Sequence, residues 1–263
     1  MWFLQILKYL VTSKNGLVVT SIPIILHTLA SVLTAGSLVL VERKFLALIQ
    51  RRVGPNMAGY KGRNQFIADA IKLLLKETIY IQNVNKSILV FLPTLYLVIN
   101  LIFMFSISWD NNLVYLSLEY DLVNIMLLMA LSNKIIIYIG PVLKNKYTTI
   151  SSTRAAVIAL NMDITMALVI NTIIMYSGSF NLNQMMKLNQ NMNPSAFLVI
   201  VLLPTLFILL MDLGRAPFDL VESETELIMG FFSEYSGFLF VIFLLGEYLH
   251  IAIICHLINA ILI

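Results

Sequence analysis

The chain has 263 residues, of which 59% are hydrophobic and only 12% charged, and its formal net charge at pH 7 is +3. Soluble domains are about half apolar and about a quarter charged, so this composition excludes a water-soluble globular protein and predicts a membrane protein. The small net charge gives no reason to expect a nucleic-acid partner. The single cysteine, Cys255, excludes an internal disulfide or a cysteine-ligated metal cluster.

The apolar residues are grouped into long stretches, and a helix needs about 20 such residues to cross a bilayer. We expect about six spans, near residues 17–41, 87–107, 122–143, 155–176, 196–211 and 235–263. The fold class predicted is therefore all-α: a polytopic transmembrane helical bundle that forms a single membrane domain over residues 1–263.

The loops between the spans differ in charge. The loop after the first span and the loop before the fourth are rich in lysine and arginine, whereas the loops on the other side contain one basic residue, Lys187. Basic loops stay in the cytoplasm or the mitochondrial matrix, so the N-terminus is predicted to lie on the outer face.

Within the first loop, residues 64–77 have the pattern of an amphipathic helix. One side is polar and contains Gln65, Asp69, Lys72 and Lys76, and the other side is apolar. This pattern predicts a helix in the plane of the membrane interface. It also fits a loop helix packed on protein, and both readings hold if the helix covers a cavity that opens into lipid.

Three acidic residues fall inside or at the ends of the apolar spans: Asp163, Asp212 and Glu247. A charged group at the bilayer centre costs about 2.5–3.5 kcal/mol on insertion scales, so such groups commonly serve a function. Carboxyl groups in dry sites can take up and release protons near neutral pH, and a row of them predicts a proton path. The alternative is that protonation or a local partner neutralises each one.

The acidic loop at about 212–234 extends this row. It contains Asp219, Glu222, Glu224, Glu226 and Glu234, with Arg215 as its only basic residue. On a helix Asp219, Glu222 and Glu226 would share a face. The loop is either part of the proton path or a solvated acidic segment.

For the other polar residues in the spans, two roles stay open. Lys134 is expected to reach the interface or to pair with an acid, and His250 and His256 act either as proton relays or as polar contacts between helices. No metal-ligand spacing surrounds the histidines. The chain also lacks a Walker loop, a dinucleotide GxGxxG and haem or iron–sulfur patterns, so any redox centre must lie on a partner.

Several segments of the chain resemble the family of subunit 1, the quinone-site membrane subunit of NADH:ubiquinone oxidoreductase (respiratory complex I). They are 41–44 (VERK), 50–56 (QRRVGPN), 65–72 (QFIADAIK), 177–182 (SGSFNL), 214–220 (GRAPFDL), 222–227 (ESETEL), 233–237 (SEYSG) and 246–248 (GEY).

The resemblance implies roles for two groups of residues. The quinone tunnel is expected to involve Arg43, Arg52, Phe66, Asp69 and Tyr248. The proton path is expected to involve Asp163, Asp212, Asp219, Glu222, Glu224, Glu226 and Glu247.

The resemblance also implies the partners and cofactors. Ubiquinone is the expected substrate, and NADH, FMN and the iron–sulfur clusters are expected on partner subunits, with no covalently bound group and no metal site on this chain. The expected partners are other complex I subunits, among them the hydrophilic quinone-site subunit and small membrane subunits, together with membrane lipids.

The chain departs from the family pattern at three points. Asp163 and Asp212 stand where the family usually has glutamate, which shortens the reach of each carboxyl group by one methylene. Leu244 stands where many members have an aromatic residue. The family has eight spans and this chain has six, so either a separate polypeptide is expected to supply the last two helices or the chain is incomplete.

Other functions are weighed against this one. A related membrane subunit of a hydrogenase-type complex would share the acids but not ubiquinone. An independent proton channel or transporter would need inverted repeats or broken spans, which the sequence does not show, and a purely structural scaffold would leave the buried acids unexplained. Abundant asparagine, isoleucine, phenylalanine and methionine favour the mitochondrial inner membrane over a bacterial plasma membrane.

Overall fold

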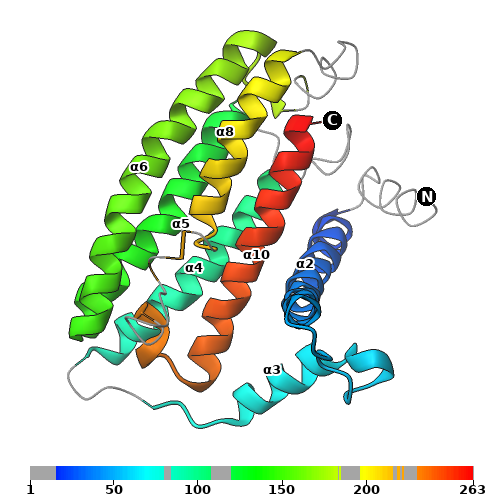
Figure 1. Cartoon of the computed structure of the whole chain (residues 1–263), viewed down its shortest axis with the longest axis vertical. Helices are drawn as coiled ribbons and strands as arrows, with labels where there is room; N and C mark the ends of the chain where they lie inside the picture. The colour runs from blue at the N-terminus through cyan, green and yellow to red at the C-terminus, as the bar shows by residue number, and fades with distance from the viewer. Residues whose placement is uncertain are drawn as a thin grey trace. The chain divides into compact units, whose positions relative to one another are not determined.

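The computed structural model describes residues 16–79, 84–107, 120–182, 184, 196–215, 218, 219, 221 and 230–262 (Figure 1). The regular secondary structure among these residues is all helical, with no strand. They divide into two compact units, residues 1–69 and residues 70–263, and each unit is described by itself.

Within the described residues, five helices are long and apolar enough to cross a membrane, and they correspond to five of the predicted spans. They are α2 (Gly16–Ile49), α4 (Lys86–Ser106), α5 (Asp121–Leu143), α6 (Lys146–Ser177) and α10 (Gly237–Leu262). The remaining predicted span is α8 (Ala196–Asp212), which has 17 residues. At 1.5 Å per residue α8 is about 26 Å long, slightly less than the hydrocarbon core of about 30 Å. The chain is therefore a polytopic helical membrane bundle.

Two helices are longer than the sequence analysis predicted. α2 continues through the polar residues 42–44 to Ile49, and α6 begins at Lys146 rather than near residue 155. The hydropathy pattern marks only the apolar part of a helix, whereas the helical backbone continues until a residue interrupts it. The positive φ of Arg51 (55°) lies just after the end of α2, and the positive φ of Lys144 (55°) ends α5 before α6 begins.

The second unit is built around α5. This helix packs along α6 and α4, α4 packs along α10, and α6 packs along α8, so that the helices lie side by side (Figure 1). α5 and α6 approach closely where Gly140 faces Ser152, because a Cβ atom on Gly140 would lie 2.0 Å from the Ser152 Oγ. Small residues at such crossings let membrane helices come into van der Waals contact.

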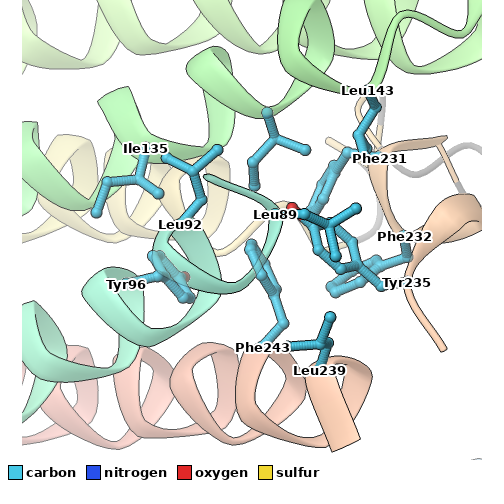
Figure 2. Close-up of a cluster of buried hydrophobic side chains, with 11 residues drawn as sticks. Leu89, Leu92, Tyr96, Ile135, Leu143, Phe231, Phe232, Tyr235, Leu239 and Phe243 are labelled. Carbon is cyan, nitrogen blue, oxygen red and sulfur yellow. The ribbon is translucent and has the colours of Figure 1, made fainter. Parts of the chain in front are cut away.

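A cluster of buried aromatic and aliphatic side chains joins α4, α5 and α10 to the short helix η2 (Gly230–Glu234) (Figure 2). Phe243 of α10 is central: its ring stacks on Tyr96 of α4 at 4.7 Å between centroids and meets Phe232 edge-on at 5.0 Å. This cluster fixes the last part of the acidic segment and the start of α10 against the bundle.

The first unit contains α2, the loop that follows it, the short helix η1 (Tyr60–Gly62) and the first residues of α3 (Gln65–Leu75). Gly62 has φ 74°, and a Cβ atom there would lie 2.1 Å from the Pro55 carbonyl oxygen, so only glycine fits this turn. The predicted interface helix at 64–77 corresponds to α3.

Candidate functional site

Asp69, near the start of α3, forms an ion pair with Arg43 of α2. Its Oδ2 accepts a hydrogen bond from Arg43 Nη1 at 2.5 Å, and its Oδ1 accepts one from Gln65 Nε2 at 3.0 Å. Phe66 packs against α2 at Gly36, where a Cβ atom would lie 2.7 Å from the ring. The helical spacing of Gln65, Phe66 and Asp69 therefore sets the start of α3 against α2.

The predicted quinone residues are brought together only in part. Arg43, Phe66 and Asp69 line one pocket with Val39, Leu40, Pro55 and Gln65. This pocket has a volume of about 10 Å³, which holds at most one water molecule. Arg52 is exposed on the loop after α2 and does not line it. Tyr248 belongs to the second unit.

A second polar site surrounds Asp212, the last residue of α8. Its side chain is 1% exposed, and both carboxyl oxygens are engaged. Asn133 of α5 donates a hydrogen bond to Oδ1 at 2.6 Å, and His250 Nε2 of α10 lies 2.8 Å from Oδ2. The other ring nitrogen of His250, Nδ1, lies 3.2 Å from Oδ1 of Asn100 on α4. Four helices therefore meet at one buried polar network.

The other two acids of the spans each have a basic partner. Glu247 Oε1 lies 3.2 Å from Arg215 Nη2, and the Arg215 guanidinium also lies over the Tyr248 ring at 5.4 Å. Asp163 Oδ2 lies 3.1 Å from Lys134 Nζ, on the adjacent helices α6 and α5. Of the two roles expected for Lys134, reaching the interface or pairing with an acid, this contact shows the second.

Two cavities adjoin Asp212. One, of about 80 Å³, is lined in part by Asp212, Glu247 and His250, and the other, of about 290 Å³, by Asp163 and Asp212 among several methionines. Asn133, Met162 and Asp212 line both cavities. Asp212 thus lies in the wall between a cavity that contains Glu247 and a cavity that contains Asp163.

The acidic loop is described only at some positions. Asp219 Oδ1 is buried and has no hydrogen-bond partner among the described residues. Glu234 accepts a hydrogen bond from Asn145 Nδ2 at 2.5 Å, which ties the end of this loop to the start of α6. Glu222, Glu224 and Glu226 lie outside the described residues.

The sequence analysis did not single out Asn100 and Asn133. Both are amides inside apolar helices, and this is the signal by which they could have been found, because a buried amide needs partners. His250 was expected either as a relay or as a polar contact between helices, and it does connect α4, α8 and α10. Within the described ranges, no group of three or more histidine, cysteine or acidic side chains could hold a metal ion.

Comparison with known proteins identifies similar chains over most of the sequence. Residues 22–263 match the family model described as NADH dehydrogenase. The chain is 38% identical to NADH-ubiquinone oxidoreductase chain 1 of Paramecium tetraurelia over 220 residues, which are 83% of this chain and 84% of that protein. It is 31% identical to the chain 1 protein of Neurospora crassa (90% of this chain, 64% of that protein) and 31% identical to an NADH-quinone oxidoreductase subunit of Rickettsia bellii (90% and 71%).

Proposed function

The chain belongs to the NADH dehydrogenase family, and we propose that it forms part of the ubiquinone site and the first part of the proton path of the enzyme. It is a membrane subunit of NADH:quinone oxidoreductase. Its apolar helices make it a multi-pass protein of the mitochondrial inner membrane or of a bacterial plasma membrane. The observation that carries the proposal is the position of Asp212 between two cavities that each contain another acid.

The proton path consists of Glu247, Asp212 and Asp163, in that order. Glu247 and Asp212 line the smaller cavity, and Asp212 and Asp163 line the larger one, so each step is between two acids of the same cavity. A cavity can hold a water molecule once its volume reaches about 10–15 Å³, so the cavity of about 290 Å³ has room for several. Water in these cavities would carry protons between carboxyl groups that do not touch. Asp219, Glu222, Glu224 and Glu226 would extend the path through the acidic loop.

The quinone site uses Arg43, Phe66 and Asp69 as part of its wall, with Arg52 as a further lining residue of the first unit. Asp69 fixes the Arg43 guanidinium through a direct contact, and Phe66 presents an aromatic ring beside it. A fixed cation and an aromatic surface suit a quinone ring, whose carbonyl oxygens accept hydrogen bonds. The pocket in this chain is too small for the ring, so partner subunits must complete the site.

Partner subunits are also required by the Lys134–Asp163 pair. It lies in the middle of two membrane helices, yet the Lys134 side chain is 51% exposed and that of Asp163 is 31% exposed. Charged groups are costly in contact with lipid, so another membrane subunit would cover this surface.

Reduction of ubiquinone consumes two electrons and two protons. The electrons would come from NADH through FMN and iron–sulfur clusters on other subunits of the complex.

The experiment that tests this proposal is Glu247→Gln in the assembled enzyme. The glutamine keeps the size of the side chain and can still contact Arg215, but it cannot carry a proton. We expect NADH:ubiquinone reductase turnover to fall by about tenfold or more, the range of single acid–base groups, and proton translocation to fall with it. NADH oxidation by an artificial acceptor, which does not use the membrane subunit, should be unchanged.

Glu77→Gln provides a matched control, because Glu77 is an exposed acid outside both cavities. Both variants should appear in the NADH-oxidising band of a native gel. Normal turnover and normal proton translocation in the Glu247→Gln enzyme would remove Glu247 from the path and refute the proposal.

A further inference from the structure

His250 is held on both sides of its ring, deep inside the second unit. Its side chain is 5% exposed, and its two nitrogens face two different groups: Nδ1 faces Asn100 Oδ1 at 3.2 Å, and Nε2 faces Asp212 Oδ2 at 2.8 Å. A ring nitrogen of histidine can donate or accept, so the partners decide where the protons lie.

The amide of Asn100 decides the state of Nδ1. Its Nδ2 donates a hydrogen bond to the carbonyl oxygen of Gly246 at 3.0 Å. A carbonyl oxygen can only accept, so the Asn100 atom facing it must be the NH₂ group, and the atom facing His250 must be the oxygen. An amide oxygen also only accepts. His250 must therefore carry a proton on Nδ1.

The contact between Nε2 and Asp212 then has room for one proton. With that proton on Nε2, the pair is an imidazolium beside a carboxylate. With it on Oδ2, the pair is a neutral imidazole beside a carboxylic acid. Both states keep every hydrogen bond in the network, including the bond that Asn133 donates to Oδ1. With no proton the two acceptors would repel, and with two protons the two donors would clash, so both of these states are disfavoured.

We propose that His250 carries a proton in the proton path, and that His250 and Asp212 together hold one proton and act as a single step between Glu247 and Asp163. The tautomer follows from the geometry alone, whereas the role in turnover rests on the proposed function. The pair lets a proton reach the centre of the bundle without an unpaired charge in a site that is almost fully buried.

The charged groups around the pair explain how it would respond to turnover. Glu247 lies three residues before His250 on α10 and lines the same cavity, where Arg215 contacts its carboxylate. On the other side, Asp163 lines the cavity shared with Asp212 and is paired with Lys134. A change of charge at Glu247 or Asp163 shifts the proton within the His250–Asp212 pair, while the net charge of the pair stays zero.

The test is His250→Gln in the assembled enzyme. Glutamine can donate a hydrogen bond to Asp212, but it cannot accept and return the proton. We expect kcat for ubiquinone reduction to fall by about tenfold or more, with the KM for ubiquinone within about twofold, because the change affects proton transfer and not quinone binding. Proton translocation per NADH should fall as well. His256→Gln, which changes a partly buried histidine of α10 that lines neither cavity, should keep normal turnover.

Asn100→Leu provides a second variant if His250→Gln does not assemble. Without the amide oxygen, the imidazole can place its proton on Nε2 and donate it to Asp212, and the pair loses its shared proton. We expect a similar fall in kcat, and the double variant should be no slower than His250→Gln alone, because both changes act on one unit.

Three outcomes overturn the inference: normal kcat and normal proton translocation in His250→Gln, normal kcat in Asn100→Leu, or an equal loss in His256→Gln. The Glu247→Gln enzyme separates the two proposals. If Glu247→Gln impairs turnover and His250→Gln does not, only the role of the pair fails. If Glu247→Gln is normal, the proposed path itself fails.

Discussion

Replacing Asp69 by asparagine tests the contact between α2 and α3 directly. Asparagine has almost the same shape as aspartate and can still accept the hydrogen bond from Gln65 Nε2, but it removes the negative charge beside Arg43. If the contact positions Arg43 for ubiquinone, the variant should lose quinone reduction. If the contact only stabilises the fold, the variant should lose assembly.

The structure predicts a small effect on stability. The Arg43 side chain is 52% exposed and that of Asp69 is 33% exposed. Water and salt screen an ion pair at this level of exposure, so its loss costs about 0–1 kcal/mol. A change of this size should leave the first unit folded and the complex assembled. A large loss of activity would then report on function, since a tenfold fall in rate corresponds to about 1.4 kcal/mol.

The assay compares two reactions of the same purified enzyme. We expect Asp69→Asn to lower NADH:ubiquinone reductase activity by about tenfold or more, with a raised KM for ubiquinone, and to leave NADH oxidation by an artificial acceptor intact. Asp69→Ala should act in the same direction. Lys72→Gln, which removes an exposed charge from the next turn of α3, provides the control and should have near-normal activity in both reactions.

Two outcomes would refute this reasoning. Equal losses in both reactions would mean that the enzyme is misassembled, and the small stability effect expected from an exposed pair would be wrong. Normal ubiquinone reduction would mean that Asp69 has no part in the quinone site.

Two further changes test the packing. Gly140→Ala would place a Cβ atom 2.0 Å from Ser152 Oγ and 2.3 Å from Ser152 Cβ. We therefore expect a native gel to show a strong loss of assembled complex, partly restored when Ser152→Gly is added. Full assembly of the single variant would contradict the close approach of α5 and α6. Burial raises the pKa of Tyr235, and its hydroxyl oxygen is buried with no hydrogen-bond partner among the described residues. Tyr235→Phe should therefore leave thermal inactivation of the enzyme unchanged or slow it, by an amount corresponding to about 1 kcal/mol, and clearly faster inactivation would reveal a partner for that hydroxyl.

The spans and the interface helix could be predicted from the sequence because both depend on local properties. A long apolar stretch has to cross the membrane wherever its neighbours lie, and α4 and α5 begin and end within one residue of the expected bounds. The polar and apolar sides of residues 64–77 indicated α3 for the same reason. The motifs around Arg43, Asp69, Arg215 and Glu247 indicated the family, which the comparisons confirm.

The partners of the buried groups could not be predicted from the sequence. His250 contacts Asp212 and Asn100, which are 38 and 150 residues away, and Asn133 contacts Asp212 across 79 residues. The helices α6 and α10 carry apolar residues on most of their sides, so no apolar stripe in the sequence indicates which side of each helix faces inward. Only the rotation and pairing of the packed helices bring these polar groups together.

The sequence by itself thus determined that the chain is a membrane protein, where most of its helices lie and which acids are placed in them, because transfer of a segment into lipid depends on that segment's own composition. The tertiary structure alone decided that Asp212 shares its environment with His250, Asn133 and two cavities. The physical reason is that hydrogen bonds and cavities arise between helices, from side chains that meet only when the helices pack.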